Sequence, residues 1–193
     1  KSQGANIIIG PIDNEQFKEV EKFNDTVFIS LSNKNPEFQN NVISIGVSFE
    51  SQMLALMKFI KKQKRNKTII LLPINQYTIF IEKKLSKLNL ENYKIFKYNP
   101  DPKILTGEIE ILTNYTQRKK NLELRKKIFE DKEDDQSKKE LKSLEQKYTL
   151  GDVNFDSVII VDFGSSLKSV LTSLVFTDVD QEKVLLTTVN QWF

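Results

Sequence analysis

Polar residues that could bind a ligand follow directly after short apolar runs in this sequence. Asp162–Ser166, which reads Asp-Phe-Gly-Ser-Ser, follows the run Val158–Val161, and the turn-rich stretch 32–36 follows the run Val27–Leu31. Hydroxyl groups and main-chain N–H groups at the start of a helix suit a carboxylate, because those N–H groups have no partner within the helix. The same residues also suit a turn or a helix cap without any ligand, and for Asp162–Ser166 we favour the cap.

The sequence limits the reactions that this chain could catalyse. It contains no His and no Cys, so the commonest general base, the commonest transition-metal ligand and the thiol nucleophile are missing. Asp152–Asp156 opens like a calcium loop, but Ser157 and Phe163 stand where that loop requires Gly and Glu. The chain has no GxGxxG or GxxxxGK phosphate-binding motif. We therefore expect a protein that is not an enzyme and that uses no metal and no cofactor.

The composition is typical of a folded domain. Of 193 residues, 39% are apolar and 28% are charged, which is enough for one large domain or two small lobes. The net charge of +3 comes from nearly balanced numbers of basic and acidic residues, so it gives little support to nucleic-acid binding. No stretch approaches the roughly 18 apolar residues that a membrane span requires.

Short β-branched runs alternate with amphipathic helical patterns along the chain. The runs that we predict as strands are Asn6–Ile9, Val27–Leu31, Val42–Ile45, Thr68–Leu72, Tyr93–Tyr98, Val158–Val161 and Val184–Thr188. Helical spacing lies between them, for example at Met53, Leu56, Met57 and Ile60, with Ser48 as the candidate N-cap. This alternation predicts an α/β fold of mostly parallel sheets with helices on both faces. Ligands of such sheets bind at the carboxyl ends of the strands.

The stretch 118–147 is the most charged part of the chain. It follows a helix that we predict from Glu108 through Tyr115, and 19 of its 30 residues are charged, 11 positively and 8 negatively. We predict a projecting helical hairpin that bends near Glu130–Asp135, with a second helix that starts at the capping box Ser137–Glu140. The simpler interpretation, which we favour, is a solvated arm held by i,i+4 ion pairs. The other is a docking surface for a protein or an anionic surface.

Several of these segments together resemble the type I periplasmic binding proteins. Gly4–Ile12 looks like the strand and turn GA-x-x-IIGP of that superfamily, and Val27–Asn33 looks like its next strand, which reads roughly P-x-I-S-x-S. Val42–Gln52 is similar to the segment that crosses into the second lobe. Within the superfamily the sequence is most similar to the penicillin-binding protein activator lipoproteins. That similarity lies in the charged helical insertion before Asp156 and in the ending Asn190–Trp192.

The resemblance implies a two-lobed domain of the type I kind in which lobe 1 is incomplete. Residues 1–45 would form part of lobe 1. Residues 46–188 would form lobe 2, with the helical arm 118–147 as a long charged insertion. Residues 189–193 would start the return of the chain to lobe 1.

The resemblance also implies candidate ligand-binding residues. In amino-acid-binding relatives, groups of the first two loops hold the ligand carboxylate, and an aromatic residue of lobe 2 covers the apolar body of the ligand. Carried onto this sequence, those positions are Asp13, Ser30, Ser32, Asn33 and Tyr77. Asp162 ends a strand and could reach the same cleft. The negative charge of Asp13 would repel a carboxylate, and we favour turn and cap roles for the loop residues.

We therefore expect a binding domain of a cell-envelope lipoprotein in the periplasm. Its membrane contact would be a lipid anchor outside these residues, attached to the outer membrane. By resemblance, it would bind and activate a penicillin-binding protein in peptidoglycan synthesis. The alternative is an amino-acid receptor of an ABC transporter, with a small amino-acid-like ligand between its lobes. A third hypothesis is a doubly wound enzyme domain that resembles this fold only in outline. We expect no nucleic-acid partner.

Overall fold

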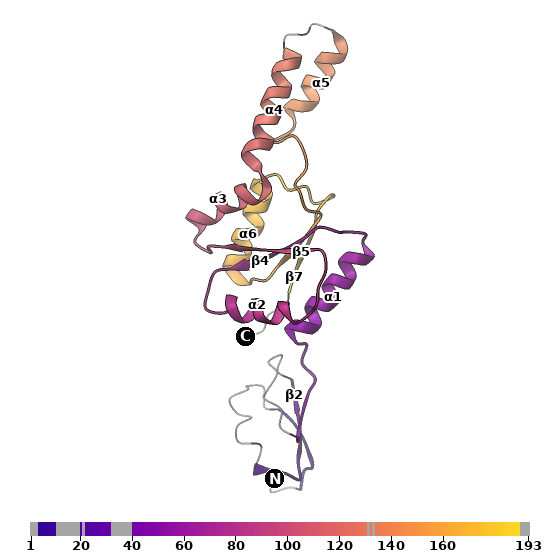
Figure 1. Ribbon diagram of the computed structural model, residues 1–193, viewed down its shortest axis with the longest axis vertical. Coiled ribbons are helices and arrows are strands. Elements are labelled where there is room, and N and C mark those ends of the chain that lie inside the picture. Colours follow the sequence, from indigo (N-terminus) through magenta and orange to yellow (C-terminus); the bar gives the residue numbers. More distant parts are fainter. Residues whose placement is uncertain are drawn as a thin grey trace. The chain divides into compact units, whose positions relative to one another are not determined.

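The computed structural model describes residues 4–10, 20, 22–31, 40–130, 132 and 134–189. The chain divides into two compact units (Figure 1). One unit consists of Lys1–Ala55 with Asn190–Phe193, and the other consists of Leu56–Val189. The division falls inside helix α1 (Phe49–Lys62), whereas we had predicted boundaries after residues 45 and 188.

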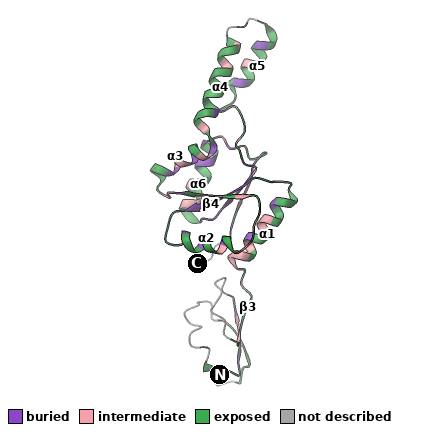
Figure 2. Ribbon diagram, viewed as in Figure 1, coloured by how far each residue is buried: buried purple, intermediate pink, exposed green. Residues whose placement is uncertain are grey.

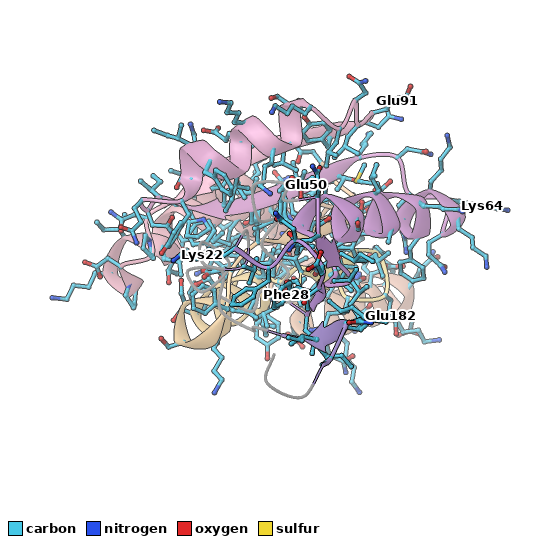
Figure 3. The ribbon with its side chains drawn as sticks, turned by 90° about the horizontal axis from the view of Figure 1, so that it is seen from below. Lys22, Phe28, Glu50, Lys64, Glu91 and Glu182 are labelled. Atoms are coloured by element: carbon cyan, nitrogen blue, oxygen red, sulfur yellow. The ribbon has the colours of Figure 1, made fainter. Side chains whose placement is uncertain are left out.

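The first unit contains a three-stranded parallel sheet in the order β1-β2-β3. Its strands are β1 (Ile7–Ile9), β2 (Val27–Ser30) and β3 (Val42–Ser44). Phe28, which Figure 3 labels, packs with Val20, Ile8 and Val42 on one face of this sheet. Residues 11–19, which follow β1, lie outside the described residues.

The second unit is built on a four-stranded parallel sheet in the order β5-β4-β6-β7. Its strands are β4 (Thr68–Pro73), β5 (Tyr93–Tyr98), β6 (Ser157–Ile160) and β7 (Leu185–Thr188). Every residue of β4 and β6 is buried (Figure 2). Strands that are covered on both faces need continuous apolar runs rather than alternating ones, and the runs at Ile69–Leu72 and Val158–Ile160 meet that need.

Helices cover both faces of this second sheet. On one face, α3 (Pro102–Thr113) and α6 (Gly164–Phe176) pack against each other and share a core with β4 and β6. Ile70 and Leu72 point to the other face, because side chains alternate along a strand, and neither is exposed to solvent. The connection from β4 to β5 runs across the sheet in the opposite direction to the connection from β6 to β7. Because both crossovers are right-handed, their helices lie on opposite faces, and α2 (Thr78–Ser86) therefore covers the face opposite to α6.

The predicted α/β class with parallel sheets and helices on both faces is confirmed. Each strand within the described residues overlaps a predicted strand. The predicted N-cap Ser48 is also confirmed, because its hydroxyl oxygen accepts a hydrogen bond from the N–H of Ser51 at 3.2 Å. No helix in the described part of the chain is long and apolar enough to cross a membrane.

Two predicted helix starts are wrong. Helix α3 begins at Pro102 rather than Glu108, because Asp101 caps it by accepting a hydrogen bond from the N–H of Lys103 and Pro102 suits the first turn. The second helix of the arm, α5 (Asp135–Glu145), is capped by Asp134, which accepts from the N–H of Ser137 at 2.8 Å. The predicted capping box at Ser137 therefore lies inside the first turn instead of before it.

The charged stretch forms the predicted helical hairpin. Helix α4 (Tyr115–Glu130) follows α3 after Asn114, whose left-handed conformation ends α3, and it lies beside α5 (Figure 1). Leu122 on α4 and Leu144 on α5 are buried, while most other residues of the two helices are exposed (Figure 2). The hairpin bends after Glu130, as predicted. Few apolar side chains are therefore buried in the hairpin, and most of its surface is exposed to solvent.

Candidate functional site

The carboxyl ends of β4, β5 and β6 meet at one edge of the second sheet, which is where ligands bind in parallel α/β folds. Hydrogen bonds fix the loops that leave this edge. The N–H of Ile74 donates to the carbonyl of Tyr98 at 2.8 Å, and the N–H of Val161 donates to the carbonyl of Leu71 at 3.0 Å. The loops after neighbouring strands therefore start from well-defined positions.

A buried carboxylate lies at this edge. Oδ2 of Asp162 accepts hydrogen bonds from the hydroxyls of Tyr98 and Ser166, and Oδ1 accepts from the N–H of Phe163 at 2.8 Å. Burial and the hydrogen bond to Asp162 both raise the pKa of Tyr98, so its hydroxyl stays protonated and donates. Gly164, with a φ of 61°, makes the left-handed turn from β6 into α6.

This arrangement joins three elements rather than opening toward solvent. Tyr98 ends β5, Asp162 follows β6, and Ser166 lies in the first turn of α6. The negative charge also lies at the N-terminus of α6, where the helix dipole stabilises it. The observed contacts of Asp162 are those of a carboxylate that links the end of β5 and the segment after β6 to the hydroxyl of Ser166 in the first turn of α6; its side chain accepts no hydrogen bond from an N–H of the helix.

Exposed aromatic side chains follow β4 and β6 at this carboxyl edge. Tyr77, after β4, is 44% exposed, and Phe163, after β6, is 53% exposed. The loop before Tyr77 is tightly built, because the N–H of Tyr77 donates to Oδ1 of Asn75 and the hydroxyl of Thr78 donates to the carbonyl of Pro73. The carboxyl edge thus combines a fixed polar interior with accessible aromatic surface.

The structure brings together two of the predicted ligand-binding residues. Tyr77 and Asp162 follow the neighbouring strands β4 and β6 of one sheet. Ser30 ends β2 in the first unit and is fully buried. The remaining candidates lie outside the described residues: Asp13, Ser32 and Asn33.

Sequence analysis did not find Tyr98 as the partner of Asp162. The signal was present, because a tyrosine that becomes buried at the end of a strand needs a hydrogen-bond partner for its hydroxyl. The nearest polar side chains along the chain were Asn99 and Asp101, and the observed partner lies 64 residues away. Only the pairing of strands shows that β5 and β6 both flank β4.

A cavity of about 440 Å³ lies at the opposite edge of the same sheet, where β4 and β5 begin. Its polar lining consists of Asn66, Lys67, Thr68, Asn92, Tyr93, Lys94 and Asn154. The neighbouring carboxylate of Asp156 accepts hydrogen bonds from the N–H groups of Asn66 and Lys67. This cavity is therefore separate from the carboxyl edge at which we predicted a ligand.

No family model matches this sequence. No curated protein matches it significantly either. An extracellular ligand-binding receptor from Verminephrobacter eiseniae is similar in structure over 97% of this chain and 46% of its own, with 6% sequence identity and a TM-score of 0.48. A probable maltose operon transcriptional repressor from Staphylococcus aureus is similar over 93% of this chain and 62% of its own, with 16% identity and a TM-score of 0.41.

This chain therefore spans about half the length of the receptor and less than two thirds of the repressor. Both proteins have the type I periplasmic-binding-protein-like fold, and neither is a penicillin-binding protein activator. The assignment of this chain to the parallel α/β class rests on its own sheets and helices.

Proposed function

We propose that this chain is a non-enzymatic, periplasmic-binding-protein-like domain of a cell-envelope lipoprotein that binds and activates a penicillin-binding protein. The observation that carries the proposal is the hairpin α4–α5, which is inserted between β5 and β6. A crossover between parallel strands needs only one helix, and α3 already covers the sheet there. The crossover therefore does not need the hairpin, which can serve as a surface for a partner protein. The hairpin is also the charged insertion before Asp156 on which the resemblance to the activators depends.

The hairpin is anchored firmly to the sheet unit by Arg118. This residue is buried, and its Nε donates to the carbonyl of Gly151 at 2.9 Å. Its two Nη atoms donate to the carbonyl of Thr177 at 3.0 Å, and to the carbonyl of Asp178 and the hydroxyl of Thr149 at 2.8 Å. A surface held in one position loses little conformational entropy when a partner binds, which supports a docking role.

The proposal is tested by adding the full-length mature protein to purified penicillin-binding proteins of the source organism and measuring glycan polymerisation and peptide cross-linking. We expect a saturable increase in one of the two rates. A variant outside the hairpin, Lys58→Ser with Lys61→Ser on α1, removes the same amount of positive charge and should leave the stimulation unchanged. If none of the penicillin-binding proteins is bound or stimulated, the proposed function is wrong.

A second candidate function, an amino-acid receptor, is favoured by one observation. Tyr77 presents an accessible aromatic side chain at the carboxyl end of β4, and Asp162 follows the adjacent β6. An aromatic wall suits the apolar body of a small ligand. Against this candidate, the carboxylate of Asp162 already accepts three hydrogen bonds from its own chain. We therefore place this candidate second.

A further inference from the structure

We propose that the outward face of α4 docks an acidic amphipathic helix of a partner protein. This face, the α4 stripe, consists of Leu124 and Ile128 with the flanking cations Lys120, Arg125 and Lys127. Only the identity of the partner, a penicillin-binding protein, rests on the proposed function; the docking surface itself is argued from α4.

The apolar part of the α4 stripe is not needed to hold the hairpin together. The buried residues of α4 are Arg118 and Leu122, one turn apart on the inner face. Leu124 and Ile128 are also one turn apart, but they lie on the outer side and are 50% and 52% exposed. Single exposed aliphatic residues are normal on protein surfaces. Two that align at i,i+4 make a short ridge, which is the unit that packs into the groove of a second helix.

The charges around this ridge all have the same sign. At about 100° of rotation per residue, Lys120 and Lys127 lie along one side of the ridge, and Arg125 lies on the other side next to Ile128. The two carboxylates of α4, Glu123 and Glu130, lie roughly 100° or more away from the ridge. The α4 stripe is therefore an apolar ridge bordered by cations.

These cations are not neutralised by the ion pairs that the simpler interpretation of the arm predicted. Among the described residues, Lys119, Lys120, Lys126 and Lys127 make no ion pair, although Glu123 or Glu130 stands three or four residues from each of them. Arg125 lies over the ring of Phe129, 4.7 Å from its centroid. The i,i+4 prediction is wrong for these lysines, and their charge is available to an external anion.

The chemistry of the partner follows from this pattern. Aliphatic side chains at i, i+3 or i+4 would pack beside Leu124 and Ile128, and Glu or Asp on either side would pair with the lysines, as flanking charges do in paired helices. An anionic membrane fits less well. Helices that lie on membranes have a broad apolar face, whereas this ridge has only two aliphatic side chains.

The test measures fluorescence anisotropy of a labelled synthetic helix, with Leu along one face and Glu beside it, against the full-length protein. We expect saturable binding that weakens as salt is added. The variant Leu124→Ser with Ile128→Ser should bind at least about tenfold more weakly, because the buried aliphatic area is lost. The variant Lys120→Ser with Lys127→Ser should bind more weakly and with a smaller dependence on salt.

Matched variants on other helices control this test. Ile79→Ser on α2, also an exposed aliphatic residue, and Lys138→Ser with Lys142→Ser on α5 should leave the affinity unchanged. Circular dichroism verifies that each variant is folded. Unchanged affinity in the Leu124→Ser, Ile128→Ser variant would overturn the proposal, and so would binding to phosphatidylglycerol vesicles without binding to the helix.

The helix assay contains no penicillin-binding protein, so its failure can be distinguished from failure of the proposed function. Loss of helix binding in the stripe variants supports the docking surface whatever the enzyme assay gives. Absence of stimulation in the enzyme assay, together with intact helix binding, rejects the penicillin-binding protein as the partner and leaves the α4 stripe as a docking surface.

Discussion

At the scale of single residues, Arg118 shows how one side chain fixes an inserted element. Its guanidinium joins two parts of the second unit: Thr149 and Gly151, which precede β6, and Thr177 and Asp178, which follow α6. Burial lowers the pKa of Arg118, yet an arginine stays charged at neutral pH. The hydrogen bonds therefore offset the cost of removing this charge from water.

We predict that Arg118→Met destabilises the protein by about 3 kcal/mol, because it leaves several buried acceptors without a donor. Urea denaturation measures the change. Arg118→Lys should recover only part of the loss, since one ammonium cannot reach acceptors that point in different directions. Arg125→Met, on the exposed side of the same helix, is the control and should change stability by less than about 0.5 kcal/mol. Equal effects at the two positions would contradict the anchoring role.

At the scale of elements, Asp156 ties the starts of two adjacent strands together. Its carboxylate precedes β6 and accepts hydrogen bonds from the N–H groups of Asn66 and Lys67, which precede β4, at 2.8 and 3.0 Å. Partial burial acts to raise the pKa of Asp156, but these N–H donors outweigh it and the pKa is lowered. The charged form is therefore favoured in the folded protein.

This lowered pKa predicts a dependence of stability on pH. The contribution of Asp156 is fully present above the pKa of the unfolded chain, about 3.9, and is lost as the pH falls through the lower pKa of the folded state. Asp156→Asn should therefore lower the melting temperature at pH 7, by an amount that corresponds to about 1 kcal/mol. The difference between the two proteins should shrink below about pH 4. A difference that stays constant down to pH 2 would show that the charge has no part in this link.

At the scale of the whole molecule, the two units differ in how completely their sheets are covered. The second sheet has buried side chains on both faces. In the first sheet, Ile7, Ile9 and Ile43 lie on one face and are exposed.

The amino-acid-receptor hypothesis requires that the whole folded protein binds a small ligand. A thermal-shift screen of the full-length mature protein against amino acids and peptidoglycan fragments tests the receptor hypothesis. A ligand at 100 times its Kd stabilises a protein by about 2.7 kcal/mol, which raises the melting temperature by several degrees in a domain of this size. If one amino acid gives a saturable shift, Tyr77→Ala should reduce it, and Tyr148→Ala on an exposed residue elsewhere should not. No shift across the library favours the activator hypothesis.

Much of the fold was predictable because its signals are local. The strands were found from β-branched apolar runs, and α1 was found from its spacing and its cap, Ser48. The predicted helix began too late, at Glu108, because its start at Asp101 and Pro102 follows directly after a strand and was not distinguished from a turn. Of the candidate site, Tyr77 and Asp162 each follow a strand, as predicted, but the sequence did not show that these strands are neighbours or that Asp162 is hydrogen-bonded to Tyr98.

Residue types and local spacing were enough to predict an α/β protein that lacks His and Cys and that carries a charged helical hairpin. These properties depend on residue type and on contacts within a few turns of helix or one strand. The tertiary structure alone decided which groups meet. Strand order brought Asp162 to Tyr98, and packing buried Arg118 while it left the lysines beside it in solvent, because such contacts join residues 30 or more positions apart.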